Sequence, residues 1–181
     1  MLIETERLIL REFELSDLDD FSTIMANPEV MRFSISGPWN PEQTKRFLEN
    51  CLVDYSKERW GFGRWAVMNK KDDRLIGFSG LARWGDIDGS AEVEIGYRLL
   101  PEYWGQGFGT ESAAASRDYG FEHLGLSRLI SIILPENVIS IRIAEKIGMA
   151  FEKEILKWER RILVYAISSG KSYKLSLKND G

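Results

Sequence analysis

Three glycines alternate with other residues at positions 105, 107 and 109. They lie between a segment rich in Val, Ile, Tyr and Leu (91–100) and a segment of helical composition (110–123). Glycine permits unusual backbone angles and leaves no Cβ to block a close ligand. Several N–H groups can then converge at the helix N-terminus, where the helix dipole adds partial positive charge. The pattern predicts a loop that binds phosphate or pyrophosphate, or else a tight turn that only connects strand to helix.

Two better-known phosphate-binding loops do not fit this segment. A P-loop requires Gly-Lys-Ser/Thr, and no such pair follows Gly107 or Gly109. The dinucleotide fingerprint G-x-G-x-x-G requires a third glycine where this chain has Thr110.

The remaining pattern predicts an α+β fold: a mixed, mostly antiparallel central sheet flanked by helices. Ser16 is expected to cap the first helix, Asn40 the second and Asn137 the last, which Gly148 closes. The expected strands are 5–13, 63–69, 75–84, 91–100, 129–134, 151–158 and 163–168, and the expected helices are 16–25, one from Pro41, 110–123 and one after Asn137. No repeat or linker interrupts the chain, so we expect one domain over residues 1–181.

Composition excludes several classes of protein. With 44% hydrophobic and 29% charged residues, the chain has the balance of a soluble globular protein. No segment is long and apolar enough to span a membrane, and the charges within Met1–Arg11 do not suit a secretory signal, so we expect a cytoplasmic protein with no membrane partner. A net charge of −4 does not predict nucleic-acid binding. A single Cys51 and a single His123 leave no disulfide and no metal site expected.

The order of four motifs is more specific than any one of them. These are Glu94-Ile95-Gly96-Tyr97-Arg98-Leu99, the run from Tyr103 to Glu111, Asn137-Val138-Ile139-Ser140, and Glu145-Lys146-Ile147-Gly148-Met149. The ordered set resembles the GCN5-related N-acetyltransferase (GNAT) superfamily, and within it the ribosomal-protein N-acetyltransferase branch of RimJ/RimL type. The opening Thr5–Arg11 and Tyr165-Ala166-Ile167 also match that branch, so the resemblance covers nearly the whole chain.

The resemblance implies an acetyl-CoA-dependent N-acetyltransferase whose acceptor is a primary amine, either a protein N-terminus or a small molecule. It implies a splay between the strand ending at Leu99 and the strand 129–134, into which the pantetheine arm fits, and it favours a homodimer. The cofactor-binding residues that it implies are Leu99, Trp104, Gly105, Gln106, Gly107, Phe108, Gly109, Thr110 and Asn137.

Two positions depart from the broader family. Trp104 stands where Gln or Arg begins the family loop, so we expect backbone amides to hold the pyrophosphate with little help from side chains. Ala144 stands where many members carry a tyrosine acid, and alanine cannot donate a proton. This second departure supports an alternative function, a non-catalytic sensor of acyl-CoA.

Attack by an amine requires a base, because amines are mostly protonated at neutral pH. Glu94 is the expected base, directly or through a water. Glu92 is the rival because strand alternation puts it on the same face, and either carboxylate could instead be a solvated strand residue. Ser140 is the candidate donor to the leaving thiolate, although a serine in a first helical turn often bonds only that turn.

Other residues have more general interpretations. Phe33, Trp39, Trp60 and Trp84 could line an acceptor pocket or belong to the core. Glu111 is expected to complement the dipole of its own helix.

Overall fold

The computed structural model describes residues 2–56 and 62–170. The strands are β1 (Leu2–Glu4), β2 (Leu8–Arg11), β3 (Arg64–Asn69), β4 (Arg74–Ile87), β5 (Ser90–Leu99), β6 (Arg128–Ile133), β7 (Ala150–Lys157) and β8 (Arg160–Ser168). The helices are α1 (Leu18–Ala26), α2 (Pro41–Asp54), α3 (Phe108–Glu122) and α4 (Val138–Lys146), with short 3₁₀ turns η1 (Leu15–Asp17) and η2 (Pro101–Tyr103).

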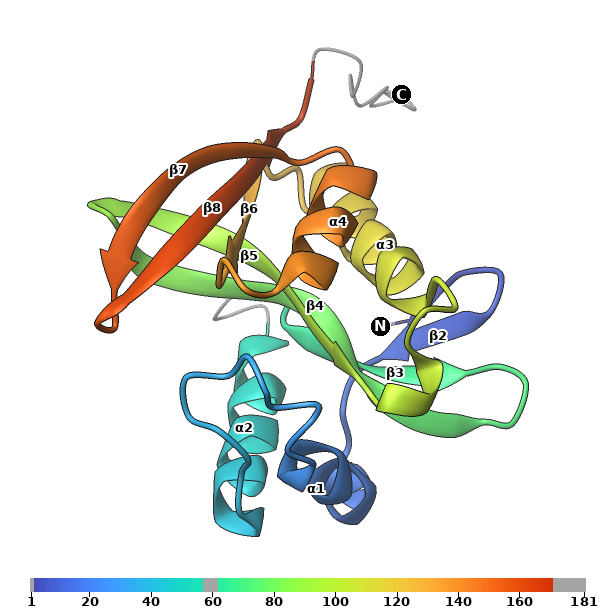
Figure 1. Cartoon of the computed structure of the whole chain (residues 1–181). Coiled ribbons are helices and arrows are strands. Elements are labelled where there is room, and N and C mark those ends of the chain that lie inside the picture. Colours follow the sequence, from blue (N-terminus) through green and yellow to red (C-terminus); the bar gives the residue numbers. More distant parts are fainter. Residues whose placement is uncertain (1, 57–61, 171–181) are drawn as a thin grey trace, which may run out of the picture.

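Eight strands form one sheet in the order β1-β2-β3-β4-β5-β6-β8-β7. Within the described residues, every neighbouring pair is antiparallel except β5 and β6, which are parallel. Helices α1 and α2 cover one face of the sheet, and α3 and α4 cover the other (Figure 1). The predicted mixed, mostly antiparallel α+β fold is therefore confirmed.

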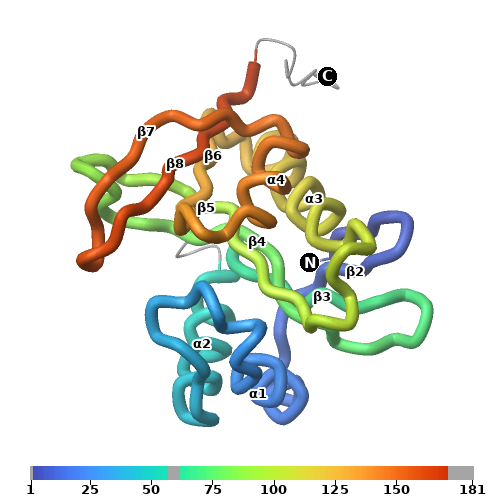
Figure 2. Tube along the Cα trace, viewed as in Figure 1, coloured from blue at the N-terminus to red at the C-terminus, as the bar shows by residue number. Residues whose placement is uncertain are grey.

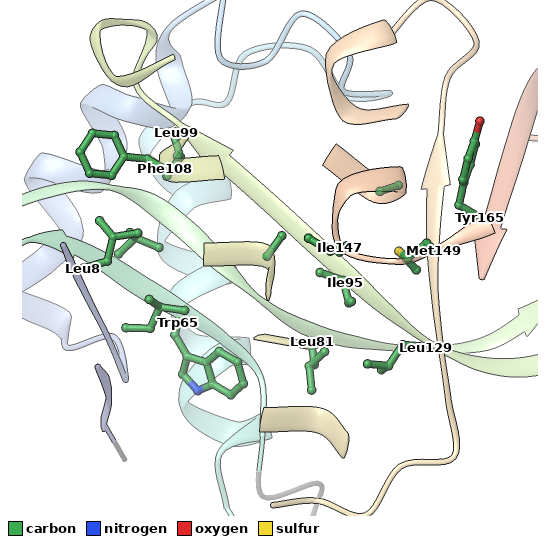
Figure 3. Close-up of a cluster of buried hydrophobic side chains, with 14 of the residues drawn as sticks. Leu8, Trp65, Leu81, Ile95, Leu99, Phe108, Leu129, Ile147, Met149 and Tyr165 are labelled. Atoms are coloured by element: carbon green, nitrogen blue, oxygen red, sulfur yellow. The ribbon is translucent and has the colours of Figure 1, made fainter. Parts of the chain in front are cut away.

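Strand alternation builds two cores on the two faces of the sheet. Trp65 and Val67 of β3 belong to a first core with Leu99 and Phe108, on the side of α3 and α4 (Figure 3). Ala66, between them in sequence, belongs to a second core that includes Phe21, Leu48 and Phe78 and lies under α1 and α2. Ligands that enter from the two sides therefore meet different surfaces.

Two of the three predicted helix N-caps are confirmed. The Asn40 side chain accepts from the Gln43 N–H and the Asn137 side chain from the Ser140 N–H, both as expected. Gly148 follows α4 with a φ of 87° and closes it as predicted. The predicted cap at Ser16 is wrong, because the η1 turn occupies that segment and α1 begins only at Leu18, after Asp17.

The first predicted strand is also wrong in extent. Residues 5–13 were expected to form one strand, but the chain turns between β1 and β2. The Thr5 hydroxyl accepts from the Leu8 N–H at 3.0 Å, and the Thr5 N–H donates to the Leu8 carbonyl at 3.0 Å. This local bonding closes a tight turn that strand periodicity does not reveal.

The parallel pair at the centre of the sheet separates early. In the described part of the sheet, Glu94 and Ile130 are the one residue pair in register between β5 and β6. Beyond that pair the two strands diverge, which is the splay expected between Leu99 and the strand 129–134. The Ile95 carbonyl accepts from the Ser131 hydroxyl at 3.1 Å, so this edge of β5 faces the opening.

No helix in the described residues is both long and apolar enough to cross a membrane.

Candidate active site

A cleft of about 480 Å³ passes through the sheet at this splay. Asn137 and Ser140 of α4 line it on one side of the sheet, and residues 33–36, between α1 and α2, line it on the other. Gly96 of β5 and Ser131 of β6 lie between those two ends. A molecule in the cleft could therefore reach from the α3–α4 face to the α1–α2 face.

The glycine loop leads directly into α3, as predicted, although the helix begins at Phe108 rather than near Thr110. Gly105 and Gly107 have φ values of 73° and 87°, which L-residues rarely adopt. Within the described residues no side chain caps the helix, and its first turn-closing bond runs from the Glu111 N–H to the Gly107 carbonyl. The N–H groups of Phe108, Gly109 and Thr110 are thus available to an anion.

Two side chains of the loop bond to backbone carbonyls that precede it in the chain. The Trp104 indole N–H donates to the Leu99 carbonyl at 2.7 Å, and the Gln106 side-chain amide donates to the Glu102 carbonyl at 2.6 Å. The Phe108 ring and the Leu99 side chain lie in the first core (Figure 3). These positions can therefore offer mainly backbone groups to a ligand, in line with the expectation drawn from Trp104.

An ion pair that the sequence did not reveal holds the loop against the start of the chain. The Glu111 carboxylate accepts from the Arg7 N–H at 2.9 Å and from Arg7 Nε at 2.7 Å. Arg7 Nη1 donates to the Gln106 carbonyl at 2.8 Å, and the guanidinium lies 4.3 Å from the centre of the Phe108 ring. Figure 2 follows the chain from β5 through this loop into α3, beside the N-terminus. Glu111 therefore does more than complement its helix dipole.

Glu94 lies in the cleft with little solvent access. Its carboxylate accepts from the Trp84 indole N–H at 2.8 Å and lies 3.8 Å from an Arg64 guanidinium nitrogen. Burial raises the pKa of Glu94, while Arg64, Trp84, Arg98 and the Ile132 N–H oppose that rise. A carboxylate of raised pKa inside a cleft is suited to accept a proton.

Glu92 is held elsewhere. Arg128 Nε donates to its carboxylate at 3.1 Å, and the same guanidinium binds Glu152 at 2.8 Å. Glu92 is not among the residues that line the cleft with Glu94. The geometry favours Glu94 over its rival as the candidate base.

Ser140 lies in the cleft beside an aromatic residue that sequence reasoning missed. Burial raises the pKa of Tyr97 to about 12, and the Ser140 side chain opposes that rise. The Tyr97 ring also approaches Gly109 of the loop, since a Cβ built there would lie 4.0 Å from it. Strand alternation could have placed Tyr97 on the face opposite Glu94, toward α4. Ala144 is buried and offers no polar group.

The aromatic residues divide between cleft and core. Phe33 and Trp84 line the cleft, and Trp158, which packs 5.4 Å from Trp84, lines it as well. Trp39 instead packs 5.2 Å from Phe47 against the second core and is not among the residues that line the cleft, so the core alternative holds for it. Trp60 lies outside the described residues. No cluster of His, Cys, Asp and Glu suited to a metal occurs in the part of the chain that the structure describes.

Comparison with known proteins defines the class as an acyltransferase. Residues 7–150 match the family model described as the acetyltransferase (GNAT) domain, which includes the glycine loop and both ends of the cleft. The chain belongs to the GNAT family of acetyltransferases.

Three known proteins represent the range of similarity. The uncharacterized N-acetyltransferase p20 of Bacillus licheniformis is 34% identical over 150 residues, which cover 83% of this chain and 82% of p20. Spermidine N(1)-acetyltransferase of Escherichia coli K12 is 31% identical over 148 residues, covering 81% of this chain and 75% of that enzyme. The structure of the ribosomal L7/L12 α-N-protein acetyltransferase RimL in complex with coenzyme A shares the fold, with a TM-score of 0.78 at 17% identity over 93% of this chain and 98% of RimL.

Proposed function

We propose that this chain transfers the acetyl group of acetyl-CoA to a primary amine. One observation carries the proposal: the cleft through the sheet has a glycine loop with free helix N–H groups near one mouth and the largely enclosed carboxylate of Glu94 inside it. Acetyl-CoA brings a pyrophosphate and an activated thioester at opposite ends of a long flexible arm. The proposal takes residues 1–181 as a single acetyltransferase domain.

The residues along the cleft fit such a donor. The free N–H groups of the first turn of α3 suit a pyrophosphate, and the absence of Cβ atoms at Gly105 and Gly107 lets it approach closely. The backbone of β5 beyond Glu94 has no partner strand in the described residues on its β6 side. Side chains occupy the Ile95 and Leu99 carbonyls, and the backbone groups of Tyr97 between them suit an amide-rich arm. Asn137, at the start of α4, lines the same passage.

Glu94 is the proposed general base. It takes a proton from the amine nitrogen, directly or through a water, so that the lone pair can attack the thioester carbon. Trp84 and Arg64 orient its carboxylate. Ser140 is the proposed donor to the leaving sulfur, with Tyr97 behind it.

The direct test is release of free coenzyme A thiol from acetyl-CoA in the presence of a panel of amines. The panel contains N-terminal peptides, polyamines and amino acids, because relatives include enzymes named for a ribosomal protein and for spermidine. We expect thiol release with at least one amine and loss of that release in Glu94→Gln. Tight binding of acetyl-CoA with no thiol release against any amine would contradict catalysis and support the acyl-CoA sensor, which the buried Ala144 favours.

We also propose a homodimer, which the resemblance to the RimJ/RimL branch supports. Light scattering coupled to gel filtration measures the mass directly. A mass near 20.8 kDa at working concentrations would contradict the dimer.

A further inference from the structure

Arg98 brings a positive charge into the acceptor side of the cleft, and no ion pair within the described residues neutralises it. It lies four residues after Glu94 on an uninterrupted stretch of β5, so both side chains leave the same face of the strand. Its guanidinium packs 5.7 Å from the centre of the Phe78 ring, and no described carboxylate lies in ion-pair distance of it. The guanidinium is thus held in place by an aromatic ring and left free to bind an anion.

The neighbouring arginine differs in this respect. Arg64 lies 3.8 Å from the Glu94 carboxylate, and a Cβ built at Gly96 would lie 3.9 Å from both Arg64 Nε and Glu94 Oε2. Glu94 and Arg64 therefore meet above Gly96, between the two ends of this stretch. The cleft is lined by Arg64, Arg98 and Glu94 as its charged described residues, so one positive charge remains uncompensated.

That uncompensated charge has a free-energy cost within the cleft. Burial, and then the nearby charge of Arg64, lower the pKa of Arg98 to about 10, and the charge of Glu94 only partly opposes them. Arg98 remains protonated at neutral pH, but its charged form is less stable than in water. An anion that binds beside it would offset this cost.

The phosphates of the donor are on the wrong side of the sheet to supply this anion. Arg98 packs against Phe78 of the second core, under α1 and α2. The glycine loop opens α3 and packs through Phe108 into the first core, on the opposite face (Figure 1). The anion must therefore belong to the molecule that enters from the α1–α2 side.

We propose that the acceptor is a small amine that carries a carboxylate, and that Arg98 binds this carboxylate while the amine lies at Glu94. This inference rests on the proposed acetyl transfer. Residues 94 and 98 are about 13 Å apart along an extended strand, and their side chains leave the same face with only Gly96 between them. The charges of Glu94 and Arg98 are close enough to act on each other's pKa, which suits an amine and a carboxylate at the two ends of one small molecule, as in an amino acid. A polyamine would instead add positive charge beside Arg64 and Arg98.

Matched acceptors test the proposal. Methionine is compared with methioninamide, and glycine with glycinamide, by thiol release at saturating acetyl-CoA. We expect kcat/KM to be at least about tenfold higher for each amino acid than for its amide, about 1.4 kcal/mol. The amide's amine is less protonated, because it lacks the carboxylate that stabilises the ammonium form, so reactivity alone would favour the amide.

Variants assign the preference to Arg98. Arg98→Gln should abolish the preference mainly through a higher KM for the amino acid, with the KM for acetyl-CoA unchanged. Arg98→Lys should retain part of the preference for the amino acid, because the positive charge remains. It should lose the rest, because lysine lacks the two parallel N–H donors of the guanidinium. Arg161→Gln, on an exposed arginine paired with Glu154 on the β7–β8 hairpin, is the matched control and should leave the preference intact.

A binding experiment separates this proposal from the proposed function. Calorimetry measures N-acetylmethionine and N-acetylmethioninamide against the protein saturated with coenzyme A. Tighter binding of the acid, lost in Arg98→Gln, supports the carboxylate site even if no amine releases thiol. Thiol release that is equal for acids and amides overturns the carboxylate site and leaves acetyl transfer standing. Equal binding of the two acetylated probes overturns it as well.

Discussion

Arg7 and Glu111 join the start of the chain to the first turn of α3, with Arg7 Nε 2.7 Å from the Glu111 carboxylate. The same guanidinium binds the Gln106 carbonyl of the glycine loop at 2.8 Å. Arg7 thus contacts the loop at the Gln106 carbonyl and at the Phe108 ring. The pair positions the loop and need not touch the donor.

Replacing Arg7 by Met should therefore weaken donor binding more than catalysis. We expect the KM for acetyl-CoA to rise about fivefold, a loss of about 1 kcal/mol, with kcat nearly unchanged. Steady-state kinetics with varied acetyl-CoA measure both constants. Arg161→Met removes a comparable but remote ion pair and serves as the control. An unchanged KM in Arg7→Met would show that the loop holds its shape alone.

The same ion pair predicts a pH dependence of stability. Burial alone would raise the pKa of Glu111, but hydrogen bonds from Thr5 and Arg7 outweigh it and hold the pKa below its ordinary value. The unfolded chain then binds a proton at a higher pH than the folded protein does, so this stabilisation is complete above the ordinary glutamate pKa and is lost as pH falls through the folded value. Urea unfolding from about pH 5 to pH 3 should show a steeper loss for the wild type than for Glu111→Gln. Parallel pH curves would contradict the assignment.

Gly107→Ala separates the cost of the backbone conformation from the effect on the loop. Gly107 and Gly125 both have positive φ, 87° and 65°, so alanine at either position should lower the free energy of unfolding by about 1 kcal/mol. A Cβ at Gly107 would also lie 3.2 Å from Arg7 Nη2, whereas nothing lies within 4 Å of a Cβ at Gly125. Calorimetry with coenzyme A should show weaker binding for Gly107→Ala alone. Equal affinities for both variants would argue against the loop as the pyrophosphate site.

Local sequence signals predicted the elements that surround the site. Asn40 and Asn137 cap their helices as expected because an N-cap depends on neighbouring residues alone. The Arg7–Glu111 pair and the packing of Arg98 on the Phe78 ring join residues far apart in the chain, and no periodicity encodes such contacts. The family pattern places an acid at the helical position of Ala144, whereas the alternation of β5 turns Tyr97 toward the same helix from the sheet.

Glu94→Gln tests the base directly, with Glu92→Gln as the matched control on the same face of β5. We expect Glu94→Gln to lower kcat by about 10²- to 10⁴-fold with little change in acetyl-CoA affinity, and Glu92→Gln to keep turnover. Because burial raises the pKa of Glu94, the wild-type kcat/KM for the amine should rise with pH through a value above that of an ordinary glutamate. Stopped assays of thiol release across pH measure this limb. Its persistence in Glu94→Gln would assign it to another group.

The proton that reaches the leaving sulfur can be traced through Ser140 and Tyr97. Burial raises the pKa of Tyr97 to about 12, so its hydroxyl is protonated at neutral pH, and we expect it to pass a proton to Ser140, which can donate in turn. Ser140→Ala and Tyr97→Phe should each lower kcat by about tenfold, and because the two act as one chain, the double variant should be little slower than either single variant. Single-turnover kinetics isolate this step from product release. Near-wild-type turnover in Ser140→Ala would mean that Ser140 bonds only within the first turn of α4. Multiplicative losses in the double variant would mean that the two hydroxyls act separately.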